Sequence, residues 1–293
     1  MIKLQGVDKK LNGFALQDVT VELPEGYIMG LIGENGAGKT TLLKLLLGLY
    51  RQDAGEIFID GMTYAKDEKK IRNEVGWVLE EDIFSKEMKL SDQERMYGKY
   101  YDKYDNKLFT EYCRRFQLEE EEKYKRLSKG EKLKFQFAFA MAHEPRLLLL
   151  DEPTANFDPE FRQEFLKIIT DFVADGKHSV LLATHMTEEL DRIADYITFL
   201  HKGRVKFSVS REELERKYRL VSGEDYLVNL IKKDRVIYAQ KGNYSTTALV
   251  KHNKNAFYSK ELEISVPDIE TIMYYMMKGE KNGGQRNDWH GIK

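Results

Sequence analysis

The chain has 293 residues, of which 42% are hydrophobic, enough for one large soluble domain and a smaller one. Its 47 basic and 49 acidic residues leave a net charge of -2, which argues against a nucleic-acid-binding protein. A single cysteine, Cys113, excludes an intramolecular disulfide and a cysteine-built metal cluster. The apolar runs are strand-sized and the N-terminus lacks the apolar core of a signal peptide, so we expect a cytoplasmic chain that does not span a membrane.

Short β-runs and one helix are predicted for the first 60 residues. Residues 19–23 alternate between apolar and polar side chains, as a half-buried strand does, and residues 27–32 form a continuous apolar run typical of a buried strand. An apolar helix is expected over residues 41–49. Between that strand and that helix lies the run Gly33-Glu34-Asn35-Gly36-Ala37-Gly38-Lys39-Thr40.

This run fits the pattern of a phosphate-binding loop, glycine, four residues, then Gly-Lys-Thr. Gly36 and Gly38 let the backbone turn its amides toward one point, and the next helix offers its N-terminus to phosphates. Lys39 supplies charge to the outer phosphates and Thr40 a hydroxyl for Mg²⁺. The alternative is a glycine-rich turn between core elements. The residues predicted to contact ATP here are Gly33, Asn35, Gly36, Ala37, Gly38, Lys39, Thr40 and Thr41.

The middle of the chain changes in character. Residues 82–127 are strongly charged and rich in tyrosine, which indicates a helical insertion, and residues 91–94 have the spacing of a helix capping box. Further on, residues 147–150 and 180–183 are continuous apolar runs. Such runs are typical of strands buried on both faces of a mainly parallel sheet, so we predict a doubly wound α/β core.

Two carboxylates follow the apolar run at residues 147–150. Asp151 stands at the predicted strand end, where it can hold Mg²⁺, and Glu152 is placed to polarise an attacking water. In the absence of the phosphate loop, the pair would be a solvated acidic strand end. Together the two motifs predict an ATPase with Mg²⁺ as its metal.

A small C-terminal α+β domain is predicted over residues 205–279. It has a capping-box match at residues 210–213, β-runs at residues 226–228 and 236–238, and a helix over residues 267–278 closed by Gly279. No group of residues in this domain predicts a catalytic site. Residues 280–293 are polar with little to bury, and we expect them to be disordered.

The motifs together resemble the ATP-binding subunits of ABC transporters, over residues 14–185. The run Leu127-Ser128-Lys129-Gly130-Glu131 is similar to the LSGGQ signature of that family and departs from it at Lys129 and Glu131. The resemblance implies an ABC ATPase core over residues 1–204, with a mainly parallel sheet, an antiparallel β subdomain and a helical subdomain at about residues 82–143. It also requires a helix over residues 132–139, where strict alternation by itself predicts a strand.

The resemblance also implies roles for individual residues. Ser128 and Gly130 would grip the γ-phosphate of ATP bound to a second subunit. His185 matches the switch histidine, and otherwise would be a structural or surface residue. Glu80 stands where the family has its Q-loop glutamine and would bind Mg²⁺ or its water. Phe14 would stack on adenine, or else is an ordinary strand residue.

Two neighbouring segments have competing interpretations. Residues 155–158 resemble the D-loop that links the two ATP sites, with a polar turn before Pro159 as the alternative. Glu81 and Asp82 lie where the family docks the permease, or else form a solvated charge run.

The resemblance implies an ATP hydrolase that powers a separate membrane permease. The hydrolase would be a peripheral protein on the cytoplasmic face of the plasma membrane and would pair with a second ATP-binding subunit. The LSKG run and Glu80 are similar to bacterial ABC-2 exporters, which favours export of a peptide or another amphipathic molecule. Alternatives are an importer ATPase, a soluble ABC ATPase acting on ribosomes or DNA, and a regulatory ATP-binding module with little turnover.

Overall fold

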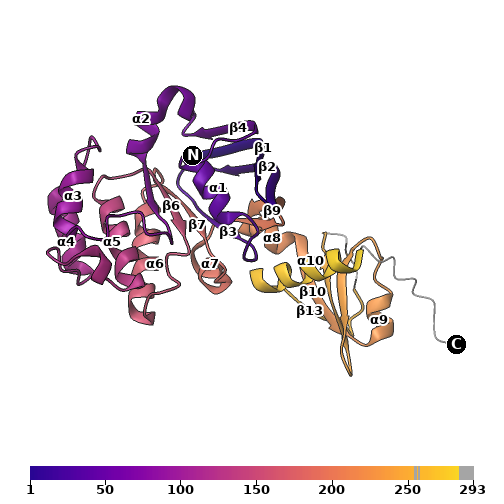
Figure 1. Cartoon of the computed structure of the whole chain (residues 1–293). Helices are drawn as coiled ribbons and strands as arrows, with labels where there is room; N and C mark the ends of the chain where they lie inside the picture. Colours follow the sequence, from indigo (N-terminus) through magenta and orange to yellow (C-terminus); the bar gives the residue numbers. More distant parts are fainter. Residues whose placement is uncertain (254–255, 257, 284–293) are drawn as a thin grey trace. The chain divides into compact units, whose positions relative to one another are not determined.

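The computed structural model describes residues 1–253, 256 and 258–283 (Figure 1). The chain divides into two compact units, Met1–Ser208 and a second one that begins at Val209. The division falls inside β9 (Arg204–Ser210), close to the predicted break after Arg204. No helix in these described ranges is both long and apolar enough to cross a membrane.

The first unit holds most of the helices and strands. Its first elements are β1 (Ile2–Leu11), β2 (Phe14–Leu23), β3 (Ile28–Ile32), α1 (Lys39–Leu46), β4 (Ala54–Ile59), α2 (Tyr64–Glu74), β5 (Val75–Val78), α3 (Leu90–Gly98) and α4 (Asn106–Arg115). They are followed by the 3-10 turn η1 (Tyr124–Arg126), α5 (Lys129–Met141), β6 (Leu147–Asp151), α6 (Pro159–Val173), β7 (Ser179–Ala183), α7 (Thr187–Ile193), β8 (Tyr196–His201) and β9.

Two sheets share one core in this unit. The larger has the strand order β5-β6-β7-β3-β8-β9, and the strands from β5 to β8 are paired in parallel. The smaller is antiparallel, with the order β2-β1-β4. Every residue of β3, β6 and β7 is buried, which explains their continuous apolar sequences. The predicted α/β core with an antiparallel β subdomain is therefore confirmed.

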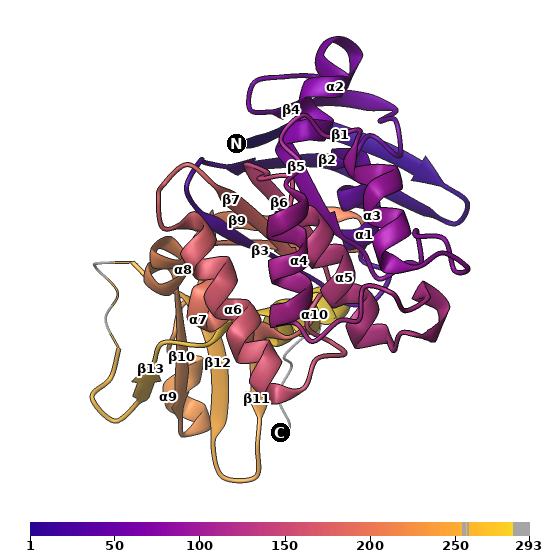
Figure 2. The same ribbon diagram turned by 90° about the vertical axis from the view of Figure 1, so that its left-hand side faces the viewer.

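A helical subdomain of α3, α4 and α5 lies beside the larger sheet (Figure 2), and α3 and α4 both pack on α5. The alternating residues 132–139 are helical within α5, as the family resemblance required. Leu133, Phe135, Phe137 and Phe139 are buried, and so are the intervening residues 136 and 138. Because the helix is buried nearly all round, its sequence shows no helical stripe.

The capping box predicted at residues 91–94 is wrong. Helix α3 begins at Leu90, and the Ser91 hydroxyl instead donates to Glu121 Oε1 at 2.9 Å. Glu94 is buried, and this burial raises the pKa of its carboxyl. Ser91 is engaged by a distant residue and Glu94 is buried, and local spacing cannot distinguish either situation from capping.

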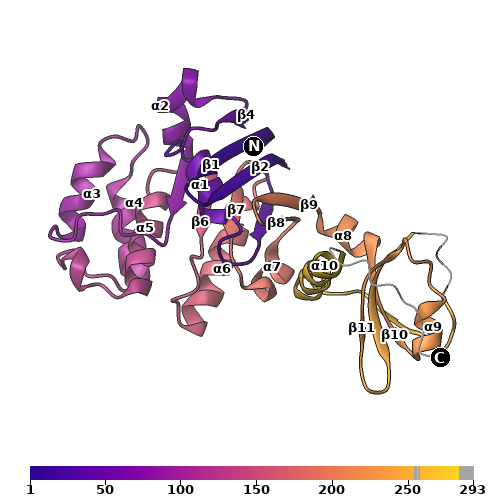
Figure 3. The same cartoon turned by 45° about the vertical axis from the view of Figure 1, so that its right-hand side comes forward.

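The second unit, described by itself, is a four-stranded antiparallel sheet with short helices. Its elements are α8 (Arg211–Lys217), β10 (Tyr218–Gly223), α9 (Asp225–Asn229), β11 (Val236–Lys241), β12 (Thr246–Lys251), β13 (Glu263–Ser265) and α10 (Ile269–Gly283). The strand order is β11-β12-β10-β13. Figure 3 shows α9 and α10 on opposite sides of this sheet, and their contacts with its strands agree. Ser210 caps α8 by accepting from Glu213 N at 3.2 Å.

Two expectations in this unit are corrected. Residues 226–228 belong to helix α9 and not to a strand, since a three-residue apolar run carries no usable period. Gly279 does not close α10, which continues to Gly283. A Cβ on Gly279 would lie 2.7 Å from Ile237 O, so the glycine lets α10 approach β11. Residues 280–283 are thus helical where disorder was expected, and residues 284–293 lie outside the described residues.

Candidate nucleotide site

The predicted phosphate loop joins β3 to α1 at the carboxyl end of the parallel sheet, where open α/β sheets bind ligands. Gly38 has φ 111°, and a Cβ there would lie 2.6 Å from Phe14 Cζ. A Cβ on Gly33 would lie 2.3 Å from Leu200 O. The loop therefore requires glycine at both positions, one for its left-handed backbone and both for close packing. It also places the Phe14 ring against the loop, beside the N-terminus of α1.

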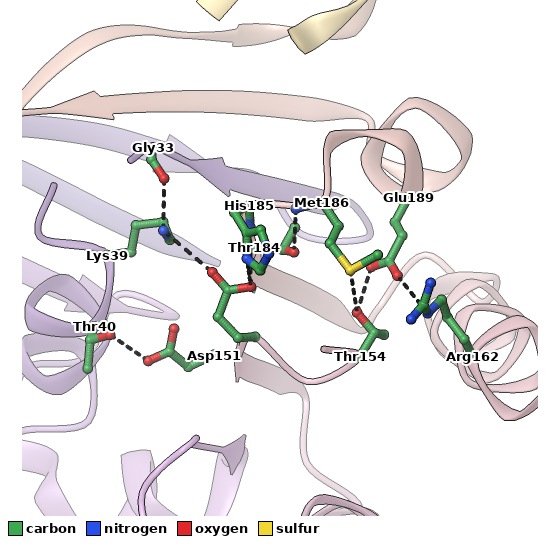
Figure 4. Close-up of polar contacts among 11 residues, drawn as sticks. Gly33, Lys39, Thr40, Asp151, Thr154, Arg162, Thr184, His185, Met186 and Glu189 are labelled. Atoms are coloured by element: carbon green, nitrogen blue, oxygen red, sulfur yellow. Dashed lines mark hydrogen bonds and ion pairs between the residues drawn. The ribbon is translucent and has the colours of Figure 1, made fainter. Parts of the chain in front are cut away.

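Lys39 begins α1 and is 7% exposed. Its Nζ donates to Gly33 O at 2.9 Å and lies 3.5 Å from Glu152 Oε1 (Figure 4). The ammonium group is thus held inside the loop and faces the carboxylate predicted to activate water. Phosphates bound in the loop would compete with Glu152 for this cation.

Thr40 and Asp151 form the expected oxygen pair. The Thr40 hydroxyl donates to Asp151 Oδ2 at 2.7 Å, while Asp151 Oδ1 is buried without a hydrogen-bond partner among the described residues. Burial raises the pKa of the Asp151 carboxyl, and the charge of Glu152 acts in the same direction. A hard divalent cation would satisfy the unpaired oxygen, so these residues fit Mg²⁺. Within the described ranges, no group of three or more His, Cys, Asp or Glu side chains could hold a metal.

Glu152 follows β6 with a left-handed backbone, φ 47°. Its N–H donates to Ala183 O at 2.8 Å, which holds the turn against β7. Its Oε2 lies 2.7 Å from His185 Nδ1 and accepts the His185 backbone N–H at 3.2 Å. The structure therefore brings together three predicted residues, with Glu152 in contact with both Lys39 and His185. An uncommon backbone conformation held by specific contacts is typical of functional positions.

The signature residues form a separate group on the helical subdomain. Ser128 caps α5: its Oγ accepts from Glu131 N at 3.2 Å, and its N–H donates to Glu131 Oε2 at 2.8 Å. These hydrogen bonds lower the pKa of Glu131. A Cβ on Gly130 would lie 2.6 Å from Asn156 O, so the glycine allows the D-loop to pack here. The sequence pattern Ser-x-x-Glu could have predicted this capping box, which explains the departure at Glu131.

The segment after β5 is exposed, as a solvated charge run would be, and two of its acidic residues form ion pairs. Lys44 of α1 donates to Glu81 Oε1 at 2.6 Å, and Lys132 of α5 donates to Asp82 Oδ2 at 3.0 Å. Glu80 between them is exposed, and its charge contributes to the raised pKa of Asp151. Glu80 is therefore close enough to influence the predicted metal site.

Residues 155–158 form the polar turn that was the alternative to a D-loop. Asp158 caps α6 by accepting from Phe161 N at 2.9 Å, as a polar turn before a helix would. Phe157 is buried against the ring of Phe161. Asn156 is exposed and faces Gly130 through its carbonyl. The same short segment thus starts a helix and contacts the signature.

Sequence reasoning missed a buried polar group behind Glu152. Thr154 Oγ1 donates to Glu189 Oε2 at 2.8 Å, and Arg162 Nε lies 3.5 Å from Glu189 Oε1. Burial raises the pKa of Glu189. This group links the turn after β6 to α6 and α7 (Figure 4). The sequence gives no signal for it, because residues 188–189 read as ordinary acidic residues of an exposed helix turn.

Comparisons with known proteins agree with this geometry. The family profile described as ABC transporter matches residues 16–155. The ABC transporter ATP-binding protein YtrB of Bacillus subtilis is 31% identical over 261 residues, covering 87% of this chain and 88% of YtrB. The tungstate uptake system ATP-binding protein TupC of Peptoclostridium acidaminophilum is 33% identical, covering 70% of this chain and 96% of TupC. The bacitracin transport ATP-binding protein BcrA of Bacillus licheniformis is 26% identical, covering 75% and 71%.

Solved structures have the same fold. An ATP-binding subunit of an ABC transporter superposes with a TM-score of 0.68 at 27% identity, covering 74% of this chain and 92% of that one. The ATP-binding cassette MJ0796, solved as a dimer with ADP and Pi, gives a TM-score of 0.64 at 22% identity, covering 72% and 98%. The phosphate loop, the paired carboxylates and these relatives together place the chain among the ATP-binding subunits of ABC transporters, and it is an ABC ATPase.

Proposed function

We propose that the protein binds ATP and Mg²⁺ in the loop at residues 33–41 and hydrolyses the γ-phosphate with Glu152 as general base. The observation that carries this proposal is the position of the Glu152 carboxylate between Lys39 and His185. Lys39 stabilises the charge that develops on the phosphates. Thr40 and Asp151 hold the metal, which supplies further charge neutralisation when bound.

His185 and Glu152 have complementary roles in the proposed reaction. The hydrogen bond between them fixes the Glu152 carboxylate, so one oxygen is oriented by the imidazole while the other can accept a proton from water. His185 has a side chain that is 59% exposed, so its ring also borders the solvent-facing side of the site. From that side we propose that it contacts the γ-phosphate.

Ser128 and Gly130 are proposed to complete the site of a second subunit. Their described contacts are with Glu131 of α5 and with Asn156, which lies between β6 and α6, and not with Lys39 or Glu152. A serine and backbone amides at the N-terminus of a long helix make a suitable anion site. The proposal therefore predicts a dimer in which each nucleotide lies between the phosphate loop of one subunit and the signature of the other.

We propose that the protein binds the permease at the cytoplasmic face of the membrane through an apolar hollow on its own surface. It measures about 500 Å³ and lies between α1, α2, β5 and the helical subdomain. Its lining includes the residues Leu47, Leu49, Tyr64, Arg72, Val75, Trp77, Leu79, Ile83, Phe84, Tyr97, Tyr100, Tyr101 and Phe139. Such aromatic, open surfaces are typical of helix-in-groove recognition. We propose that a cytoplasmic helix of the permease binds there, next to Glu80.

Export of a peptide or other amphipathic molecule is the proposed transport function. Support comes from the relatives named for bacitracin transport and, in Streptococcus pyogenes, for lantibiotic transport. The relative named for tungstate uptake supports import as the competing function. No observation favours the alternatives that act on ribosomes or DNA.

The decisive experiment is to purify the tagged chain from detergent-solubilised membranes of its own host. A multi-spanning membrane protein in stoichiometric amount is expected, and Leu49→Asp in the hollow should release it. A change on the antiparallel sheet outside the hollow, Lys9→Asp, should not. Recovery of a substrate-binding protein as well would favour import. Recovery of ribosomes without any membrane protein would refute the transporter function.

A further inference from the structure

Three basic side chains lie together at one end of the sheet in the second unit. Arg235 comes just before β11, His252 just after β12, and Arg219 near the start of β10. The strand register brings these positions together, because Val250 of β12 pairs with both Arg219 and Val236. All three basic residues are half-buried. The fold of this unit therefore collects, in what is called here the basic cluster, cationic residues that are distant in the sequence.

Tyr258 connects two members of the basic cluster. Arg235 Nη2 donates to Tyr258 Oη at 2.7 Å, and that oxygen lies 3.2 Å from His252 Nδ1. Since the phenol oxygen accepts from Arg235, its own hydrogen is available to His252 Nδ1, which leaves the ring hydrogen of a neutral imidazole on Nε2. Burial lowers the pKa of His252, and the charges of Arg219 and Arg235 act in the same direction. His252 therefore offers Nε2–H as a donor.

Neither arginine of the cluster has a carboxylate partner within the described ranges. Arg219 Nη1 donates to the carbonyl oxygens of Glu215 and Tyr218. Arg235 Nε donates to Lys251 O at 3.0 Å. With the phenol contact counted, Nε and Nη2 of Arg219 and Nη1 of Arg235 have no partner among the described residues. A guanidinium has five N–H donors, so each arginine can still bind a further acceptor.

The acidic residues nearest in the chain do not neutralise the basic cluster. Glu213 of α8 pairs with Lys217 at 2.6 Å, and Glu215 pairs with Arg211 at 3.1 Å. Asp234, another acidic neighbour in the chain, is exposed to solvent. Half-buried cations without a counter-ion repel one another, so a bound anion would stabilise this end of the sheet.

We propose that Arg219, Arg235 and His252 form a binding site for a phosphate group, separate from the nucleotide site. A phosphate monoester carries about -1.5 to -2 charges and three acceptor oxygens, which suits three donor groups that lie together. The planar fork of arginine matches phosphate oxygens in pairs. The phosphate can belong to a soluble molecule or to a lipid headgroup, because both present the same oxygens. The inference does not depend on the proposed roles of the nucleotide site.

The test follows the ring signals of His252 by NMR in the full chain, labelled with ¹⁵N at histidine and titrated with inorganic phosphate at constant pH and ionic strength. A saturable shift is expected, and His252→Gln assigns the signal. Arg219→Gln and Arg235→Gln should each weaken phosphate binding about tenfold, since charge-assisted hydrogen bonds are lost. The matched control is Arg216→Gln, because the Arg216 side chain is 65% exposed and lies 3.7 Å from Glu212.

The control variant should bind phosphate as the unchanged chain does. An unmoved His252 signal, or equal effects of Arg216→Gln and Arg219→Gln, would overturn the inference. The signal of His252 distinguishes this site from the phosphate loop, which is expected to bind phosphate as well. If thermal melting shows that Arg235→Gln unfolds the second unit, Arg219→Gln decides, because the described hydrogen bonds of Arg219 go only to carbonyls at the end of α8.

Sedimentation with vesicles then identifies the source of the phosphate. Vesicles of phosphatidylglycerol and phosphatidylcholine in equal parts are compared with vesicles of phosphatidylcholine alone. Binding to the anionic vesicles that Arg219→Gln weakens and Arg216→Gln does not would support a lipid headgroup as the ligand. No binding to either vesicle, with the His252 response to inorganic phosphate retained, would support a soluble phosphorylated molecule.

Discussion

Replacing Glu152 with glutamine tests the assignment of the general base. The side chain keeps its size and one acceptor oxygen, so its 2.7 Å contact with His185 Nδ1 can remain, while the charge facing Lys39 at 3.5 Å is lost. Loss of general-base catalysis slows a reaction by about 10²- to 10⁴-fold. That range corresponds to an activation barrier higher by about 3 to 5 kcal/mol. We expect hydrolysis to fall at least about 10²-fold.

Nucleotide binding should respond differently in the same variant. Lys39 loses its carboxylate partner and becomes more available to phosphate, so the affinity for ATP should be kept or increased. Single-turnover release of phosphate and equilibrium binding of a fluorescent ATP analogue measure the two quantities separately. Glu34→Gln is the matched control, because Glu34 lies in the phosphate loop but its carboxylate faces His201 at 3.5 Å. Near-normal turnover in Glu152→Gln, or an equal loss of binding and turnover, would refute the reasoning.

Other changes address the metal, the adenine, the D-loop contact and the cap. Burial raises the pKa of Asp151 in the folded state, so its ionisation destabilises the fold as pH rises through that pKa. In the absence of Mg²⁺, Asp151→Asn should therefore raise the melting temperature at pH 7 by a few degrees, and this gain should disappear below about pH 4. The same variant should hydrolyse ATP about tenfold more slowly or worse. An unchanged melting curve would contradict the burial argument. Phe14→Ala should weaken ATP binding about three- to tenfold in a titration, with Phe14→Trp as a control; equal affinities would make it an ordinary strand residue. Gly130→Ala should destabilise the chain by about 1 to 3 kcal/mol in urea, since its Cβ meets Asn156 O at 2.6 Å. Glu131→Ala should cost about 1 kcal/mol through loss of the cap, and Glu131→Gln should retain most of it.

The parts of the site that could be predicted from sequence are those set by neighbouring residues in the chain. The phosphate loop lies between a strand and a helix, as the glycine spacing predicts, and Asp151 and Glu152 follow a fully buried strand. These patterns succeed because a backbone shape or a strand end is determined within a few residues. The same holds for the capping of α8 by Ser210.

Contacts between distant residues could not be predicted in this way. Glu81 and Asp82 are exposed, and nothing in the sequence around them indicates their partners Lys44 and Lys132, which only the fold brings to them. The period of α5 was misleading because aromatic neighbours bury almost every face of that helix. Gly279 was interpreted as a helix end when its purpose is the close approach of α10 to β11. In each case tertiary packing overrode a correct local rule.

The apolar hollow also bears on how a cell handles subunits that lack a partner. Leu49, Ile83 and Tyr100, which line the hollow, are 54%, 41% and 67% exposed, and further aromatic side chains line it with them. An open apolar surface of this kind attracts chaperones and other unfolded chains. Surplus subunits would then be subject to aggregation and proteolysis, whereas subunits bound to a permease through this hollow, as proposed above, would be protected. The amount of the ATPase subunit that accumulates would thus depend on how much permease is made with it.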